Sequence, residues 1–117
     1  MEKGADKVAI PPHIEKQSLN EAGAFLLKQH RYIEASKCFF RAGNEEQLVA
    51  IGEWLSVQVK PREAAYFFMH TKETKKIEAC AMSCMNQGYF KEAIWLFSIT
   101  KNEQMVSFIR ENFQVNI

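Results

Sequence analysis

The sequence has no long hydrophobic run. No stretch approaches the ~20 consecutive apolar residues that a membrane-spanning helix needs. The first dozen residues, MEKGADKVAIPP, also lack the apolar core of a secretory signal. We therefore expect no membrane insertion and a cytoplasmic or nuclear protein.

A strong charge of one sign is also missing. Fifteen Lys and Arg residues stand against fourteen Asp and Glu residues, which gives a net charge of +1. So small a net charge provides no long-range attraction to nucleic acid or to anionic lipid. The densest basic stretch, KETKK at 72–76, is better explained as a solvated turn. The composition therefore disfavours nucleic acid as a partner.

Cysteine is scarce, and no two cysteines form a C-x-x-C pair. Three cysteines are too few to hold a secreted scaffold together, and they are typical of buried thiols in a reducing compartment. Cys80 and Cys84 lie one helical turn apart and could bind a soft metal. They also occupy the core stripe of a predicted helix, so we interpret them as packing residues and predict no metal site.

Catalytic signatures are lacking as well. The three histidines have no recurring carboxylate or cysteine partner: His13, His30 and His70. Three glutamates do recur, but a glutamate in the first turn of a helix is explained by the helix dipole: Glu34, Glu63 and Glu92. There is no Gly-rich phosphate loop. We expect no enzyme, no catalytic residue and no cofactor.

What the sequence does contain is a repeat. The motif Glu-Ala-x-x-x-Phe appears as EASKCF at 34–39, EAAYFF at 63–68 and EAIWLF at 92–97, always 29 positions apart. A catalytic site needs its residues only once, whereas a motif that returns at a constant interval is typical of stacked structural units.

Each repeat carries the spacing of two helices. The first helix has a stripe at i, i+3, i+4 and i+7, as in Leu19, Ala22, Gly23 and Leu26. The second has Ala and Phe four residues apart. No segment alternates as a strand would, so the sequence predicts an all-α fold of about seven helices, near 15–29, 32–42, 46–58, 61–71, 75–87, 90–100 and 103–113.

Small residues mark where the two helices of each pair approach closely, and we interpret them as structural repeat positions. In the first helices they are Gly23, Gly52 and Ala81, and in the second helices Ala35, Ala64 and Ala93. The phenylalanines that close the motif are expected to be buried and to fill the space between one pair and the next: Phe39, Phe68 and Phe97.

The predicted domain organisation is one helical repeat domain over 14–117, after a flexible extension at 1–13. Its units are 15–43, 44–72 and 73–101, followed by a single helix at 103–113. Arg110 replaces the small residue in this last helix, which favours a capping helix over one that receives a partner. The alternative is that its exposed end docks on another part of the chain or another copy through Phe108 and Phe113.

The stretches KQHRYIEASKCFFRA at 28–42 and NQGYFKEAIWLFSIT at 86–100 resemble tetratricopeptide repeats. Matching positions in the first unit are Leu19, Gly23, Leu26, Tyr32, Ala35, Phe39 and Ala42. The period is 29 rather than 34 and the closing proline is missing, so the chain is also similar to the irregular α-solenoids of clathrin-like coat and trafficking proteins. The resemblance implies a right-handed superhelix of three helical hairpins.

The resemblance also implies a function, because such stacks bind peptides or partner helices on the concave side lined by the first helices. The positions carried over are Asn20, Ala24, Leu27, Lys28, Val49, Glu53, Val57, Met82, Met85 and Asn86. Their apolar end favours an amphipathic partner. We therefore expect a protein-interaction scaffold, part of a larger solenoid protein. Two alternatives are an assembly module that binds through the stack ends and an RNA-binding helical repeat.

Overall fold

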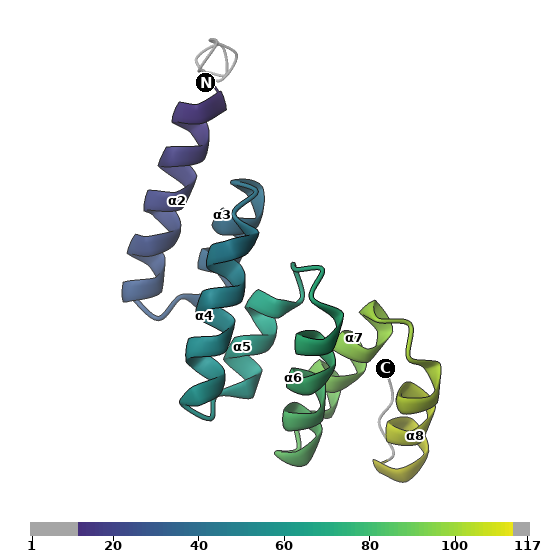
Figure 1. Ribbon diagram of the computed structural model, residues 1–117. Helices are drawn as coiled ribbons and strands as arrows, with labels where there is room; N and C mark the ends of the chain where they lie inside the picture. Colours follow the sequence, from purple (N-terminus) through teal and green to yellow (C-terminus); the bar gives the residue numbers. More distant parts are fainter. Residues whose placement is uncertain (1–11, 114–117) are drawn as a thin grey trace, which may run out of the picture. The chain divides into compact units, whose positions relative to one another are not determined.

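The computed structural model describes residues 12–113, and within them the chain is all-α, as predicted (Figure 1). No described residue lies in a strand. Seven helices follow one another: α2 (Pro12–Lys28), α3 (Tyr32–Arg41), α4 (Glu45–Val57), α5 (Pro61–Phe68), α6 (Thr74–Asn86), α7 (Phe90–Ile99) and α8 (Glu103–Phe113).

The first helix begins earlier than predicted. Pro12 is its first residue, so 12 and 13 belong to α2 and not to an extension. Proline suits this position because it has no backbone N–H, and the N–H groups of the first turn have no partner within the helix. The rest of the predicted flexible extension, 1–11, lies outside the described residues.

The chain divides into two compact units, Met1–Asn44 and Glu45–Ile117, and each is described by itself. In the first unit α2 packs against α3. In the second, α4 pairs with α5 and α6 pairs with α7, while α5 also packs on α6 and α7 on α8. The paired helices are the three predicted hairpins. Their arrangement in a single right-handed superhelix remains a prediction.

The three hairpin turns share one backbone conformation. The second residue after each first helix has a positive φ: 61° at His30, 58° at Val59 and 87° at Gly88. The next N–H then bonds to the carbonyl five residues earlier, over 3.0, 3.0 and 2.8 Å, in the pairs Arg31–Leu26, Lys60–Leu55 and Tyr89–Cys84. This is the Schellman motif that ends many helices. The 29-residue repeat of the sequence is therefore a repeat of backbone geometry.

The same motif ends α3 and α7 but not α5. Gly43 and Lys101 have positive φ, and the N–H groups of Asn44 and Asn102 bond back to Phe39 and Phe97. After α5, by contrast, the backbone closes over three residues, from Thr71 to Phe68, and the Thr71 hydroxyl donates to the same carbonyl. The predicted end of this helix at 71 is therefore wrong, and α5 ends at Phe68.

The motif phenylalanines pack against the small residues of their own hairpins. A Cβ atom added to Gly23 would lie 2.8 Å from the Phe39 ring, and one added to Gly52 would lie 2.8 Å from the Phe68 ring. Phe68 also lines a hollow together with residues of α4 and α6, so this ring borders the next pair as expected. Glycine is favoured at both positions because a methyl group would force the ring to shift.

Most of the predicted core is buried. The repeat positions of the second helices, Ala35, Ala64, Ala93, Phe39, Phe68 and Phe97, are all buried, and so are Gly23, Gly52 and Ala81. Ala22 is an exception because it is exposed. Its equivalent Cys80 packs toward the preceding hairpin, where its thiol donates to the Pro61 carbonyl. No hairpin precedes Ala22 among the described residues.

Candidate partner-binding surfaces

The first-helix surface of the second unit, formed by the outward sides of α4, α6 and α8, contains a hollow of about 210 Å³. Glu53 and Ser56 line it from α4, and buried Phe68 contributes from α5. The residues from α6 are Lys76, Ala79, Cys80 and Ser83. Thus one predicted site residue, Glu53, lies at a concave feature together with residues that the sequence did not indicate.

An ion pair spans this hollow. Lys76 of α6 pairs with the Glu53 carboxylate of α4, and the hydrogen bond to Glu53 is the main reason why the pKa of Lys76 is raised. Both side chains are about half exposed, at 41% and 51%. Exposed pairs of this kind contribute little to stability, so a ligand could displace this one at small cost.

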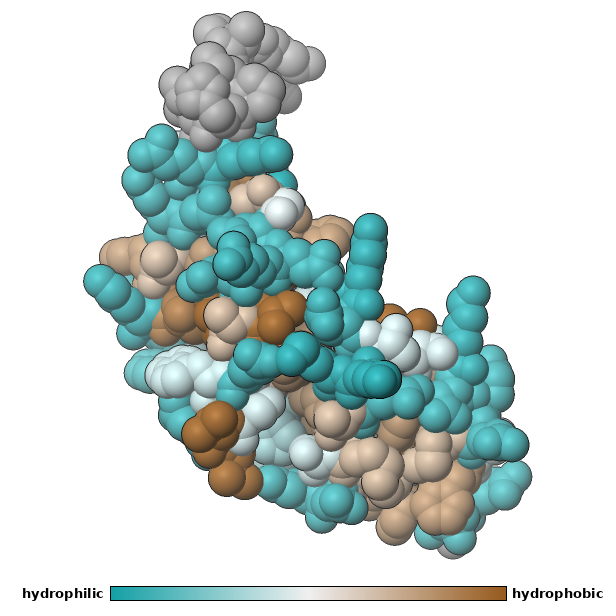
Figure 2. All heavy atoms as spheres, in the orientation of Figure 1, coloured by the Kyte–Doolittle hydropathy of each residue, from teal (hydrophilic) through white to brown (hydrophobic). Residues whose placement is uncertain are grey.

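Large apolar side chains are exposed on the helices that form the first-helix surface. Val57 is 82% exposed and Trp54 51% exposed on α4, Met82 is exposed on α6, and Phe108 is exposed on α8. At the end of α4 that leads into α5, apolar atoms stand out from a largely hydrophilic surface (Figure 2). Trp54 was missed by the sequence reasoning, although its alignment with Phe25 at the 29-residue spacing could have indicated it.

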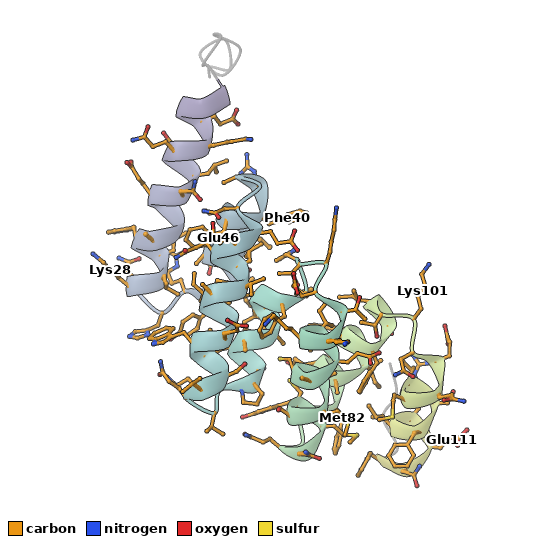
Figure 3. The ribbon with its side chains drawn as sticks, in the orientation of Figure 1. Lys28, Phe40, Glu46, Met82, Lys101 and Glu111 are labelled. Atoms are coloured by element: carbon orange, nitrogen blue, oxygen red, sulfur yellow. The ribbon has the colours of Figure 1, made fainter. Side chains whose placement is uncertain are left out.

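Met82 and Met85 are not among the residues that line the hollow; their place at an apolar end of the groove stays a prediction. They share a helix side with Glu78, at i, i+4 and i+7. The Glu78 carboxylate accepts hydrogen bonds from Thr100 at 2.8 Å and Asn102 at 3.1 Å, next to the start of α8. The two methionines therefore lie on the α8 side of α6, where Figure 3 shows Met82.

The remaining predicted positions differ in exposure. Asn86, at the end of α6, is exposed, whereas Val49 and Met85 are half-buried. In the first unit Ala24 and Lys28 are exposed, and Leu27 is half-buried. Of the predicted partner-binding positions, only Glu53 lines the hollow with α6, where it meets Lys76 and Ser83, two residues that the sequence did not indicate.

Asn20 is used within its own hairpin. Its side-chain oxygen accepts a 2.9 Å hydrogen bond from Asn44, just as Glu78, 58 positions later, accepts one from Asn102. Both contacts join a first helix to the turn that follows the second helix. Asn20 therefore has a structural role that the sequence analysis did not foresee.

The second-helix surface of the same unit, formed by the outward sides of α5 and α7, has a hollow of its own. Its volume is about 340 Å³, and it is lined by Met69, Trp95, Ser98 and Ile99. Trp95 is 44% exposed. The sequence reasoning missed this feature, although the spacing of Trp95 and Ile99, one turn apart and off the Ala93–Phe97 core stripe, was a usable signal.

Two of the recurring glutamates are held by arginines. Glu92 is buried, and Arg62 donates to its carboxylate over 3.1 Å; Arg62 also lies 5.6 Å from the centre of the Tyr89 ring. Glu34 is exposed and pairs with Arg31 at 3.2 Å. The helix dipole is therefore an incomplete explanation of this motif position, because Glu92 also joins two hairpins.

The cysteine pair is part of the core. The thiols of Cys80 and Cys84 each donate to the Pro61 carbonyl at 3.4 Å. The hydrogen bond with Cys80 and burial raise the pKa of the Cys84 thiol strongly, so it stays protonated. Among residues 12–113 no three His, Cys, Asp or Glu side chains are grouped as metal ligands would be.

No helix in the described part of the chain has the length and apolar character needed to cross a membrane. Comparison of the chain with family models, with curated proteins and with solved structures found no match.

Proposed function

We propose that the protein is a non-enzymatic interaction module of the tetratricopeptide-like α-solenoid superfamily, which acts as a scaffold in the cytoplasm or the nucleus. Its first-helix surface binds a peptide or a partner helix. The observation that carries this proposal is the recurrence, at 29 residues, of one turn geometry and one Gly–Phe contact. Repeats of this kind build extended binding surfaces.

An amphipathic partner suits this surface best. Trp54, Val57 and Met82 offer exposed apolar area, and the Glu53–Lys76 pair offers one charge of each sign beside a hollow. Flexible methionines adapt to varied apolar side chains, and large aromatics commonly anchor interfaces. A helix with an apolar stripe and polar flanks would cover both features.

The outer side of α8 disfavours assembly through this end of the stack. Most of its exposed residues are polar: Glu103, Gln104, Ser107, Arg110, Glu111 and Asn112. The two exposed aromatic residues contact other rings, because Phe108 lies 6.3 Å from Phe113 and Phe113 stacks on Phe90 with ring centres 4.3 Å apart. A polar outer side is typical of a helix that closes a repeat array. We therefore retain α8 as a capping helix.

The experiment is affinity capture with quantitative mass spectrometry, in which the wild type is compared with Val57→Glu and Met82→Glu. A charge placed in an apolar contact is left desolvated, so we expect partners of the wild type to be lost from both variants. Lys37→Glu, a change at an exposed position of α3 in the first unit, is the matched control and should keep them. Retention of every partner by both first-helix variants would contradict the proposal.

A further inference from the structure

The second-helix surface combines an apolar hollow with unpaired positive charge. The hollow is about 340 Å³ in volume, which is within the range of sites that receive ligand side chains. Its lining is apolar except for Ser98, and Trp95 and Ile99 are both more than two-fifths exposed. Exposed tryptophan beside such a hollow is more typical of a contact site than of ordinary surface.

Lysines stand at both ends of the exposed α7 stripe. Lys91 precedes Trp95 by one turn and therefore lies on the same helix side. Lys101 follows Ile99 in the turn after α7. Neither lysine has an ion-pair partner among residues 12–113. At a rise of ~1.5 Å per residue the two backbone positions are roughly 15 Å apart, with the apolar residues between them.

Negative charge offsets these lysines only at one end, where Glu103 is exposed two residues after Lys101 at the start of α8. Glu92, the acidic residue next to Lys91, is buried and paired with Arg62. Glu63 of α5 is half-buried. The exposed charges of α5 and α7 are therefore positive.

We propose that this second-helix surface is a separate binding site for an acidic peptide segment. A large apolar side chain of the segment enters the hollow beside Trp95, and flanking Asp or Glu residues pair with Lys91 and Lys101. Charge complementarity selects the acidic segment, since opposite charges at a rim set specificity and the rate of association. A concave site with few cations suits a peptide better than a flat anionic membrane.

The test uses a displayed library of random peptides, selected on the wild-type protein. We expect the selected sequences to share a large apolar residue flanked by Asp or Glu. Each selected peptide is then synthesised and titrated in a Trp54→Phe background. Because the chain has two tryptophans, Trp95 is then the only fluorophore of its kind. Its emission should shift to the blue as the peptide covers it.

Lys91→Glu should weaken binding by about tenfold or more, since it turns an attractive rim contact into a repulsive one. Replacing the acidic residues of the peptide by Asn and Gln should do the same. Met82→Glu, on the first-helix surface, should leave the titration unchanged, which separates this site from the one proposed above. Circular dichroism confirms that each variant is folded.

Four results would overturn the proposal. The first is that the selected peptides have no acidic flanks, and the second is that peptide binding is lost in Met82→Glu but kept in Lys91→Glu. The third is that phosphatidylserine vesicles, and not peptides, shift the Trp95 emission. The fourth is self-association that Trp95→Ala abolishes. The last two would assign the surface to a membrane or to a second copy.

Discussion

At the scale of single residues, the contact between glycine and phenylalanine sets how closely the paired helices approach. We predict that Gly52→Ala destabilises the protein by about 1 kcal/mol. Overpacking against the Phe68 ring costs about 1–3 kcal/mol, and the better helix propensity of alanine offsets about 1 kcal/mol of that. Urea denaturation measures the change.

The matched control for this prediction is Gly52→Ala combined with Phe68→Leu. The smaller side chain removes the overlap of the new methyl group with the ring. The loss of unfolding free energy caused by Gly52→Ala should then be smaller with leucine at position 68 than with phenylalanine at position 68. An equal cost in both backgrounds would show that the ring does not limit the helix approach.

Val59 occupies a backbone conformation that suits glycine. Its φ is 58°, which is unfavourable for a β-branched residue, and the side chain is 67% exposed and so contributes little packing. We predict that Val59→Gly stabilises the protein by about 1 kcal/mol, because the left-handed conformation costs a non-glycine residue roughly 1–2 kcal/mol. Thermal unfolding followed by circular dichroism provides the measurement.

Ala50→Gly is the matched control for this change, because Ala50 lies exposed in the middle of α4. There glycine should destabilise by about 1 kcal/mol, as it does in most helix interiors. We therefore predict that Val59→Gly raises the free energy of unfolding and that Ala50→Gly lowers it. Destabilisation by both would mean that Val59 is not held in the left-handed region.

The buried Cys84 thiol gives stability a pH dependence. Its pKa is raised in the folded protein above the ordinary value of 9.0. Below about pH 9 the thiol is protonated in both states and its contribution is complete. Above that pH the unfolded thiol ionises first, so stability falls as the pH rises, by up to about 1.4 kcal/mol per pH unit.

Comparison with Cys84→Val isolates this effect from the titration of lysines and tyrosines. Both proteins are denatured in urea between pH 7 and pH 11, and the difference between their free energies of unfolding is plotted. The difference should be flat below about pH 9 and should then change in favour of the variant. A difference that is constant over the whole range would refute the burial of this thiol.

At the scale of helices, the ion pair of Arg62 with Glu92 joins α5 to α7 across two hairpins. We predict that Arg62→Met destabilises the protein more when Glu92 is present than in a Glu92→Gln background, because the lone substitution leaves a buried carboxylate without its partner. A double-mutant cycle from urea denaturation measures the coupling. Additive effects of the two substitutions would show that the pair contributes nothing.

Helix positions followed closely from the sequence, whereas some helix ends did not. The Glu-Ala-x-x-x-Phe motif of the second helices and the apolar stripe of the first helices, both repeated at 29 residues, were enough to place seven helices within residues 12–113. The end of α5 was missed because it depends on the Thr71 hydroxyl, which competes for the Phe68 carbonyl. Threonine at that position is equally compatible with a continuing helix. The start at Pro12 was missed because two prolines in succession also suggest extended chain.

At the scale of the whole molecule, the sequence indicated which side chains are exposed but not which of them lie next to one another on the surface. Trp54, Val57 and Met82 are exposed on first helices, but the hollow on the first-helix surface is lined by other residues, among them Lys76, Ala79 and Ser83. A repeat alignment assigns each helix the same outward side. The packing of one hairpin on the next determines which neighbour that side faces. The spacing of apolar residues within one hairpin does not specify this packing.

The central claim is that equivalent hairpins recur every 29 residues. The most direct test is nuclear Overhauser spectroscopy of the protein in solution, between the ring protons of each motif phenylalanine and the α protons of the glycine in its hairpin. The account predicts strong cross-peaks for both Phe39 with Gly23 and Phe68 with Gly52. A cross-peak in one hairpin and none in the other would contradict it.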